Sequence, residues 1–366
     1  MGEKPRSSGK SHGANAATVI DEPVAMVIVN YRTPDLTKAC LSALRRERRA
    51  FRNFRVLVVD GGSGDGSVDQ LAAFIERGEF RDWVDLLALP INGGFGWANN
   101  EAICRLTIAR HPPKFIHLLN PDAEVEAGAV LSLWRFLEDH PDFAAAGSQL
   151  INVDGSLAGS GFRFTDLLDE ISRGARTRAV DRLLRRPPLV ISAQTVTEVD
   201  WTTGASVMFR VEALRQVGLF DEGFFLYHEE VELMWRLNRA GWRIALDPGS
   251  RVRHVGGAAT GMGGPGNCEA MEPRRPTYWF RSRSRYFALS RGRLFAVLAF
   301  FAWQLGYLVW LTRRIFGFAP DAKPIDHLFR DHFANAFPTK RDAIAAVRNC
   351  KGKLGCPPAW MQERPS

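Results

Sequence analysis

The sequence predicts an α/β fold: a mostly parallel sheet with helices on both faces, followed by a C-terminal helical region that is both basic and apolar. Through residue 140, short continuous apolar runs alternate with amphipathic helical patterns. Continuous apolar strands that alternate with helices are typical of a parallel sheet buried on both faces. Residues 273–366 differ because they combine an arginine cluster with a long apolar run.

The expected strands and helices follow one another in pairs. The apolar runs at 24–29, 54–60, 83–90 and 114–120 predict strands, and the segments after them predict helices at 35–48, from Ser67, up to about 110, and up to 140. Ser67 and Gln70 have the spacing of a capping box. Residues 144–164 and 196–210 are strand-like, 211–217 and the acidic segment from 229 are helical, and 242–254 is again a strand. The arginine-rich stretch 173–186 is expected to be an exposed loop or loose helix.

Composition narrows the class of protein. With 46% hydrophobic and 24% charged residues, the chain is globular, which excludes collagen-like, disordered and multi-span membrane proteins. The net charge of +8 indicates an anionic partner. Seven arginines and no acids lie within residues 274–293, so the rest of the chain is nearly neutral. This distribution favours lipid headgroups or a diphosphate over nucleic acid.

The termini and cysteines suggest three regions in a reducing compartment. Five scattered cysteines without a C-x-x-C spacing indicate neither a disulfide framework nor a zinc site. Residues 1–22 are polar, rich in Gly and Ser, and lack the apolar core of a signal peptide, so we expect a disordered tail. We expect the catalytic domain over residues 23–272 and a membrane-associating helical region over 273–366.

Polar residues follow several of the predicted strands directly. In open α/β sheets, ligands bind beyond the carboxyl ends of the strands. The polar residues at these ends are Asn30, Tyr31, Asp60, the segment 92–100 and the segment 120–122. The sequence therefore predicts a ligand site along this edge of the sheet.

Six segments carry a family resemblance: VIVNYRTP, VVDGGSGDGS, NGGFGWANN, LLNPDAEV, TGASVMFR, and GLFDEGFFLYHEEVELMWR followed by His254. In this order they resemble a family 2 glycosyltransferase with the GT-A fold, and within it the bacterial rhamnosyltransferase-type enzymes, over residues 24–257. The resemblance implies an inverting transfer of rhamnose from dTDP-rhamnose, or of another sugar from a UDP- or GDP-sugar, in the synthesis of a cell-surface polysaccharide.

The first two segments supply candidates for the nucleoside. Asp60 ends a buried strand, and the resemblance implies that its carboxylate accepts hydrogen bonds from the base or the ribose. The alternative is an ordinary aspartate that starts a turn. Asn30 and Tyr31 are expected to line the same pocket, although asparagine at such a junction also suits a turn.

The third segment is rich in glycine and asparagine. Glycines such as Gly94 permit positive φ and a close backbone approach, which suits a loop around a sugar diphosphate that includes Asn92. Asn99 and Asn100 would lie in the first turn of the following helix, where their amides either reach the donor or cap the helix.

Asn120, Pro121 and Asp122 occupy the position of the family's metal-binding D-x-D motif. Because Asn replaces the first Asp, Asp122 is the only carboxylate in this motif. Mg²⁺ or Mn²⁺ can be held by one carboxylate, a second protein ligand and the donor phosphates. The resemblance implies that His254 is that second ligand, while a lone histidine is otherwise more often structural.

An inverting transfer needs a general base, and the candidates are Glu229, Glu230 and Glu232. The resemblance maps the family's Glu-Asp pair onto Glu229 and Glu230, which makes Glu230 the base and Glu229 an acceptor-positioning residue. Glu230 has one methylene more than the usual Asp. The alternative is that the three acids merely favour the start of a helix, with Glu232 paired to Arg236.

Two further sets concern the acceptor. Thr203 and Gly204 match a family segment whose backbone borders donor sugar and acceptor, and Trp201 is either a sugar-stacking platform or part of the core. The arginines at 274–293 abut an apolar run at 294–311 that spans the membrane, lies on it or packs in a core. We expect them to form a phosphate-binding platform on the inner face of the cytoplasmic membrane for a polyprenyl-diphosphate-linked or polysaccharide acceptor. Its members are Arg281, Arg283 and Arg285.

Two other classes are less consistent with the sequence. A sugar nucleotidyltransferase would have a glycine-rich basic signature near the N-terminus, which VIVNYRTP lacks. A membrane- or nucleic-acid-binding protein without catalysis would carry the arginines but not the ordered polar motifs. Base-reading elements would be interleaved with those arginines, and here an apolar run follows them instead.

Overall fold

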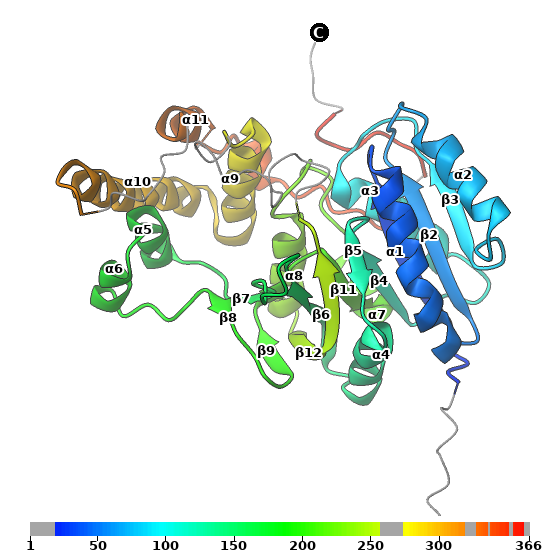
Figure 1. Ribbon diagram of the computed structural model, residues 1–366. Coiled ribbons are helices and arrows are strands. Elements are labelled where there is room, and N and C mark those ends of the chain that lie inside the picture. Colours follow the sequence, from blue (N-terminus) through cyan, green and yellow to red (C-terminus); the bar gives the residue numbers. More distant parts are fainter. Residues whose placement is uncertain (1–18, 257–273, 319–326, 336, 351–353, 362–366) are drawn as a thin grey trace, which may run out of the picture.

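The computed structural model describes residues 19–256, 274–318, 327–335, 337–350 and 354–361 (Figure 1). Residues 1–18 of the expected tail lie outside the described part of the chain, so that expectation stays a prediction.

The first half of the chain forms the parallel sheet that the sequence predicts. Its strands run in the order β3-β2-β1-β4, all parallel. They are β1 (Val24–Asn30), β2 (Phe54–Asp60), β3 (Val84–Ala88) and β4 (Phe115–Leu119). The helices between and after them are α1 (Pro34–Glu47), η1 (Arg48–Ala50), α2 (Ser67–Arg77), α3 (Phe95–Thr107) and α4 (Ala129–Asp139). Parallel neighbours need such crossover helices.

The second half extends the sheet with strands of both directions. β11 is antiparallel to β4 and β6, and β12 is parallel to β6 but antiparallel to β5 and β9. A short separate sheet has the order β10-β7-β8. These strands are β5 (Ala123–Val125), β6 (Phe143–Ile151), β7 (Gly161–Phe162), β8 (Val190–Ile191), β9 (Thr197–Val199), β10 (Trp201–Thr202), β11 (Ser206–Arg210) and β12 (Arg243–His254).

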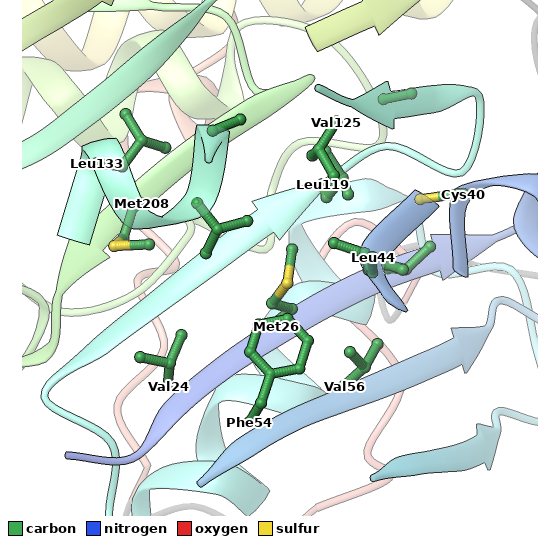
Figure 2. Close-up of a cluster of buried hydrophobic side chains, with 14 of the residues drawn as sticks. Val24, Met26, Cys40, Leu44, Phe54, Val56, Leu119, Val125, Leu133 and Met208 are labelled. Carbon is green, nitrogen blue, oxygen red and sulfur yellow. The ribbon is translucent and has the colours of Figure 1, made fainter. Parts of the chain in front are cut away.

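Apolar side chains pack on both faces of the main sheet. One cluster joins the sheet to α1, α2 and α4, as the side chains of Met26, Leu44 and Leu133 illustrate (Figure 2). The other joins it to α3, α7 (Val211–Val217) and α8 (Glu229–Arg239), with Trp97 and Leu233 fully buried. The sheet, including the carboxyl ends of its parallel strands, is thus fixed by packed helices on both faces.

The expected capping box at Ser67 is wrong. α2 begins after Gly66, which has a φ of 84°, and the Asp65 carboxylate accepts hydrogen bonds from the backbone N–H and the hydroxyl of Ser67. The left-handed glycine allows this Asx turn, so the aspartate satisfies the first backbone donor.

The arginine-rich stretch is largely helical, and its first residues pack against the C-terminal region, whereas residues 178–183 have no buried side chain. It forms the end of α5 (Leu167–Ala175) and α6 (Arg178–Leu183). α5 lies against α10 (Arg293–Ile315), as Figure 1 shows. A Cβ added at Gly174 would be 2.3 Å from the carbonyl oxygen of Trp303, and one at Gly306 would be 2.0 Å from that of Ile171. Only glycine permits this close helix crossing.

The C-terminal region contains helices and a segment that returns to the sheet. The helices are α9 (Thr277–Arg291), α10, α11 (Leu328–Asn335) and η2 (Arg341–Ala343). After them, the backbone oxygen of Arg348 accepts from Leu219 at 2.8 Å, and the Trp360 indole N–H donates to Gly93 at 2.9 Å. The returning segment therefore braces two loops at the site edge.

Candidate active site

Asn30 and Asp60 meet at the ends of β1 and β2, as expected. The strand register pairs them, and both are buried. Asn30 Nδ2 donates to Asp60 Oδ2 at 2.7 Å, while Asn30 Oδ1 accepts from the Thr37 hydroxyl at 3.0 Å. Ser63, which the sequence analysis did not single out, donates to Asp60 through both its N–H and its hydroxyl at 2.9 and 2.7 Å. Asn30 and Ser63 therefore orient the Asp60 carboxylate.

Tyr31 and Arg32 lie beside this pair. Tyr31 is half-buried and Arg32 is exposed, with its guanidinium 5.1 Å from the centroid of the Tyr31 ring. Arg32 has a φ of 57° and donates from Nε to the backbone oxygen of Ser63 at 3.0 Å. A held cation at this edge suits an anionic ligand, and the sequence analysis missed it.

The loop before α3 contacts the segment before α8. Gly94 has a φ of 92°, and a Cβ added there would lie 2.0 Å from the carbonyl oxygen of Phe225. Phe95 N–H donates to that same oxygen at 3.2 Å, and Asn92 Oδ1 accepts from Gly94 N–H at 3.1 Å. Gly94 is thus required by a backbone contact as well as by its conformation.

Asn99 and Asn100 have different surroundings. Asn100 is fully buried and exchanges two hydrogen bonds with the backbone of Phe220, at 2.9 and 3.0 Å. Asn100 therefore does not cap α3, and its amide does not point to a site for a nucleotide-sugar. It links α3 to the segment before α8. Asn99 donates to the carbonyl oxygen of Phe95 at 2.9 Å, and its buried Oδ1 has no hydrogen-bond partner among the described residues.

Asn120, Asp122 and His254 converge although 134 residues separate the first from the last. His254 ends β12, which pairs with β5 directly after Asp122. Its Nε2 lies 3.1 Å from Asp122 Oδ1 and 3.3 Å from Asn120 Nδ2. The antiparallel pairing of β12 with β5 therefore brings the two predicted metal positions together.

The acids at the start of α8 point in different directions. Glu232 pairs with Arg236 at 2.8 Å, as the alternative reading predicted. Glu229 is buried near Gly96, where an added Cβ would lie 3.5 Å from Glu229 Cγ. Glu230 faces Gly204, where an added Cβ would lie 3.8 Å from Glu230 Cβ. Glu230 is thus the acid nearest the Thr203–Gly204 segment.

Both Glu229 and Glu230 have raised pKa values. Burial is the main cause for each, and the charge of Glu230 adds to the rise for Glu229, whose pKa lies well above the usual value. Each has an Oε2 atom that is buried and has no hydrogen-bond partner in the described structure. Two adjacent carboxyls in this environment favour sharing one negative charge.

The two residues directly before α8 have a strained backbone that orients Glu229 and Glu230. Tyr227 and His228 have φ values of 70° and 66°, which is rare for two consecutive non-glycine residues. Aromatic contacts with α9 hold them, because the His228 ring stacks on Tyr286 at 5.8 Å and the Tyr227 ring stacks on Tyr278 at 6.1 Å. The strain and its supports set the direction in which α8 begins.

A cavity of about 350 Å³ lies in front of Glu230. Aromatic side chains form much of its wall, and Trp201 is among them. Trp201 is half-buried, stacks on Phe162 at 4.2 Å, and donates from its indole N–H to the backbone oxygen of Arg163 at 3.2 Å. The other Phe, Tyr and Trp residues of the wall are Phe162, Tyr227, Trp279, Tyr286 and Phe287. Aromatic faces next to a carboxylate suit a sugar.

The segment Thr203–Ala205 connects this cavity to the metal positions. Gly204 approaches Glu230, and the carbonyl oxygen of Ala205 accepts from Asn120 N–H at 2.9 Å. This segment therefore lies between the cavity in front of Glu230 and the Asn120–Asp122 turn.

The expected arginine platform is wrong for two of its three members. Arg283 is buried and contacts Glu170 and, at 3.0 Å, His332 Nε2. Arg285 is buried and donates to Asp221 at 2.7 Å. Arg281 is exposed and donates to Asn335 at 3.1 Å. Charged side chains that are buried in ion pairs hold helices together and leave no guanidinium for a lipid phosphate.

The mixed sheet, the flanking helices and the polar edge together define an α/β fold of the GT-A type. The glycosyl transferase family 2 model matches residues 25–217, and the chain belongs to this family. It is therefore an enzyme of the glycosyltransferase class, similar to rhamnosyltransferases.

Known relatives agree with this class. N-acetylglucosaminyl-diphospho-decaprenol L-rhamnosyltransferase of Mycobacterium tuberculosis is 29% identical over 222 residues, which cover 57% of this chain and 69% of the relative. Rhamnosyltransferase WbbL of Escherichia coli is 26% identical over 167 residues, covering 44% of this chain and 60% of the relative. The solved structure of GalNAc-T7 with UDP, GalNAc and Mn²⁺ has a TM-score of 0.54 at 12% identity, over 86% of this chain and 58% of that chain.

Proposed function

We propose that this enzyme transfers rhamnose from dTDP-rhamnose, with inversion and with a divalent cation, to a lipid-linked or polysaccharide acceptor in cell-surface glycan synthesis. A UDP- or GDP-sugar is the alternative donor. The observation that carries the proposal is the position of Glu230, which lines an aromatic cavity on one side of the Thr203–Ala205 segment while Asn120 is bonded to the other end of that segment.

The donor is proposed to lie along the carboxyl ends of the strands. Asp60, oriented by Asn30, would receive the nucleoside beside Tyr31, and Asn92, Gly94 and Asn99 would border the sugar diphosphate. Thr203 and Gly204 would separate the donor sugar from the acceptor. The geometry of Asn100 supports a role in positioning this loop, because Phe220 occupies both ends of its amide.

The residues around Asp122 fit a divalent cation. The carboxylate of Asp122 and the imidazole nitrogen of His254 converge there beside the side-chain amide of Asn120, and Mn²⁺ or Mg²⁺ accepts carboxylate oxygen and imidazole nitrogen as ligands. His254 Nε2 faces both Asp122 and Asn120, and a neutral imidazole nitrogen cannot donate to the first and accept from the second at once. Among the described residues no cluster of three His, Cys, Asp or Glu could hold a metal, so phosphate oxygens of the donor would complete the ligand set. A bound cation would offset the charge that develops on the leaving nucleoside diphosphate.

The chain's own acids would carry the proton transfer. Glu230 would accept the proton of the acceptor hydroxyl as the acceptor oxygen bonds to the anomeric carbon and the bond to the diphosphate breaks on the opposite face. Attack from that face inverts the anomeric centre. Glu229, whose pKa is the more strongly raised, would stay protonated and so leave Glu230 as the single anion.

The acceptor is proposed to reach the cavity from the inner face of the cytoplasmic membrane. Among the helices described, α10 alone has the length and apolar composition that crossing a bilayer requires. Of its most apolar 18-residue stretch, 33% is buried in the protein. Its exposed apolar side chains recur every three or four residues on one face. They are Leu294, Leu298, Phe301, Leu305 and Leu308.

Because its opposite side packs on α5 and α9, we propose that α10 lies on the membrane as a peripheral or monotopic element and does not cross it. Arg293 and Arg314 at its two ends are exposed and suit anionic headgroups. We accordingly divide the chain into a tail at 1–22, a catalytic domain at 23–272 and a membrane-associating region at 273–366.

The test of the proposed base is Glu230→Gln with Glu232→Gln as control. Loss of a general base lowers turnover by roughly 10²–10⁴-fold, whereas nucleoside diphosphate affinity should stay unchanged. The control removes a carboxylate that is already paired with Arg236 and should retain transfer if the protein folds, which circular dichroism checks. Wild-type turnover in Glu230→Gln would eliminate Glu230 as the base.

The test of the proposed cation site uses Asp122→Ala and His254→Ala. Binding of dTDP or UDP is measured by titration calorimetry with Mn²⁺ and with EDTA. Both variants should lose the increase in affinity that Mn²⁺ gives to the wild type, while their affinity in EDTA should be unchanged. An undiminished Mn²⁺ effect in both variants would contradict the site.

A further inference from the structure

A second cavity, of about 710 Å³, lies at α5 and α6. Its wall carries six arginines and two aspartates, so its charge is strongly positive. The arginines are Arg173, Arg176, Arg178, Arg182, Arg185 and Arg186. We refer to it as the arginine cavity. Guanidinium groups suit phosphate, because their planar fork can donate two parallel hydrogen bonds to its oxygens.

Some of these arginines serve the fold and others face the cavity without an ion pair. Arg186 pairs with Asp166 and Asp169 at 2.7 and 2.8 Å, and Arg173 pairs with Glu170 at 3.0 Å. Arg178 and Arg182 are exposed and form no ion pair within the described part of the chain. Their charges are therefore available to an anionic ligand.

The arginine cavity adjoins the cavity in front of Glu230. Arg173, Leu189 and Val190 line both. An acceptor sugar placed against Glu230 would thus have its anomeric substituent directed past these three shared residues toward the arginine cavity. A single ligand with a sugar at one end and phosphates next to it fits the two cavities together.

The arginine cavity also lies beside the apolar helix. The guanidinium of Arg176, on its wall, is 5.2 Å from the centroid of the Trp310 ring of α10. Trp310 is buried, so the arginine cavity meets α10 on its packed side, and the exposed apolar face lies on the other side of the same helix. The order sugar, phosphate, lipid is matched by Glu230, the arginine cavity and α10.

Buried histidines lie near the two cavities. The pKa of His228 is lowered to about 3 and that of His332 to about 2, first by burial and then by the positive charges of neighbouring arginines that include Arg173. These histidines stay neutral at physiological pH, so the positive charge there comes from arginine alone.

We propose that the arginine cavity binds the diphosphate of a lipid-diphosphate-linked acceptor sugar. The proposal rests on the proposed function, and it replaces Arg283 and Arg285 of the expected platform with Arg178 and Arg182. It also fixes the acceptor as a sugar diphosphate ester in place of a neutral polysaccharide end.

Binding is tested with decyl diphosphate, which has no sugar, by titration calorimetry in EDTA so that no cation draws it to the donor site. The wild type should bind it, and Arg178→Gln/Arg182→Gln should bind roughly tenfold more weakly or worse, since two charge-assisted contacts are lost. Arg178→Lys/Arg182→Lys should retain most of the affinity. Arg46→Gln/Arg49→Gln, which removes two exposed charges near the end of α1, should bind like the wild type.

Turnover provides a second and separate readout. With a decyl diphosphate ester of N-acetylglucosamine as the acceptor, the Arg178→Gln/Arg182→Gln variant should show a KM raised roughly tenfold with kcat little changed. With neutral decyl N-acetylglucosaminide its KM should equal that of the wild type.

Failure of the wild type to bind decyl diphosphate, or equal affinity in the glutamine variant, would overturn the proposal. An equal rise in KM for the neutral acceptor would also overturn it. Because the binding measurement uses no sugar donor, an absence of sugar transfer would contradict the proposed function and leave the binding result to decide on the arginine cavity.

Discussion

Replacement of Arg285 by alanine separates a structural role for this arginine from a role in binding the acceptor. Arg285 is 6% exposed and donates from Nη2 and Nε to Oδ1 of Asp221, at 2.7 and 3.1 Å, while Asp221 is fully buried. Nη2 also donates to the backbone oxygen of Ile344 at 2.9 Å. The arginine therefore connects α9, the segment before α8 and the returning C-terminal segment.

The expected cost follows from what the alanine leaves behind. Asp221 would keep hydrogen bonds from the N–H groups of Gly223 and Ala346, but its negative charge would lose its counter-ion in a buried position. Removing one partner of a buried ion pair typically costs about 3 to 5 kcal/mol of unfolding free energy. For a chain of this length that corresponds to a decrease in Tm of about 4 to 7 °C.

Thermal unfolding followed by circular dichroism measures this decrease, with Arg281→Ala as the matched control. Arg281 is exposed on the same helix, so its loss should change the unfolding free energy by less than about 0.5 kcal/mol. An Arg285→Ala variant that melts with the wild type but has a raised KM for the acceptor would refute the structural interpretation and restore the expected platform.

Three further predictions concern the site and its surroundings. The raised pKa of Glu229 means that the folded protein holds a proton that the unfolded chain releases. The stability that this group contributes is therefore present below the usual carboxyl pKa and is lost as pH rises through the folded pKa. Glu229→Gln should accordingly raise Tm at pH 8 and change it little at pH 4. The reverse pattern in calorimetry would contradict this assignment. Gly94→Ala forces a Cβ against a backbone oxygen and should cost about 3 kcal/mol in urea unfolding, against about 1 kcal/mol for Gly128→Ala, where φ is also positive but space is open; equal costs would contradict the contact. Leu305→Glu on the exposed face of α10 should reduce sedimentation with anionic vesicles, whereas Ile108→Glu, exposed directly after α3, should not; identical sedimentation would argue against this face.

The features that the sequence predicted best are those set by short stretches of chain. Continuous apolar runs placed β1, β2 and β4, and the parallel arrangement then brought Asn30 beside Asp60 without any long-range information. The convergence of Asp122 and His254 was predicted only through the family resemblance. It depends on the pairing of β12 with β5, which no local pattern reveals.

The features that the sequence did not predict depend on distant partners. The counter-ions of Arg285 and Arg283 lie 64 and 113 residues away in the sequence. The absence of acids near these arginines therefore gave no sign that both are buried in ion pairs. The sequence did not predict that α5, in the arginine-rich stretch, is packed, because this packing depends on the close contact between Gly174 and α10. Gly94 read as a generic glycine of a phosphate loop because its backbone partner, Phe225, lies in another part of the chain.

The central claim is that this enzyme transfers a sugar with inversion, using a divalent cation and Glu230. The most direct measurement is the release of nucleoside diphosphate from dTDP-rhamnose and from UDP- and GDP-sugars, with the decyl diphosphate ester of N-acetylglucosamine as the acceptor. Each donor is tested with Mn²⁺, Mg²⁺ or EDTA. NMR then gives the configuration of the product's anomeric centre. The account predicts acceptor-dependent release from one donor, loss of release in EDTA and in Glu230→Gln, and an inverted anomeric centre. Release that persists in EDTA, a retained anomeric configuration, or no release from any of the donors would contradict it.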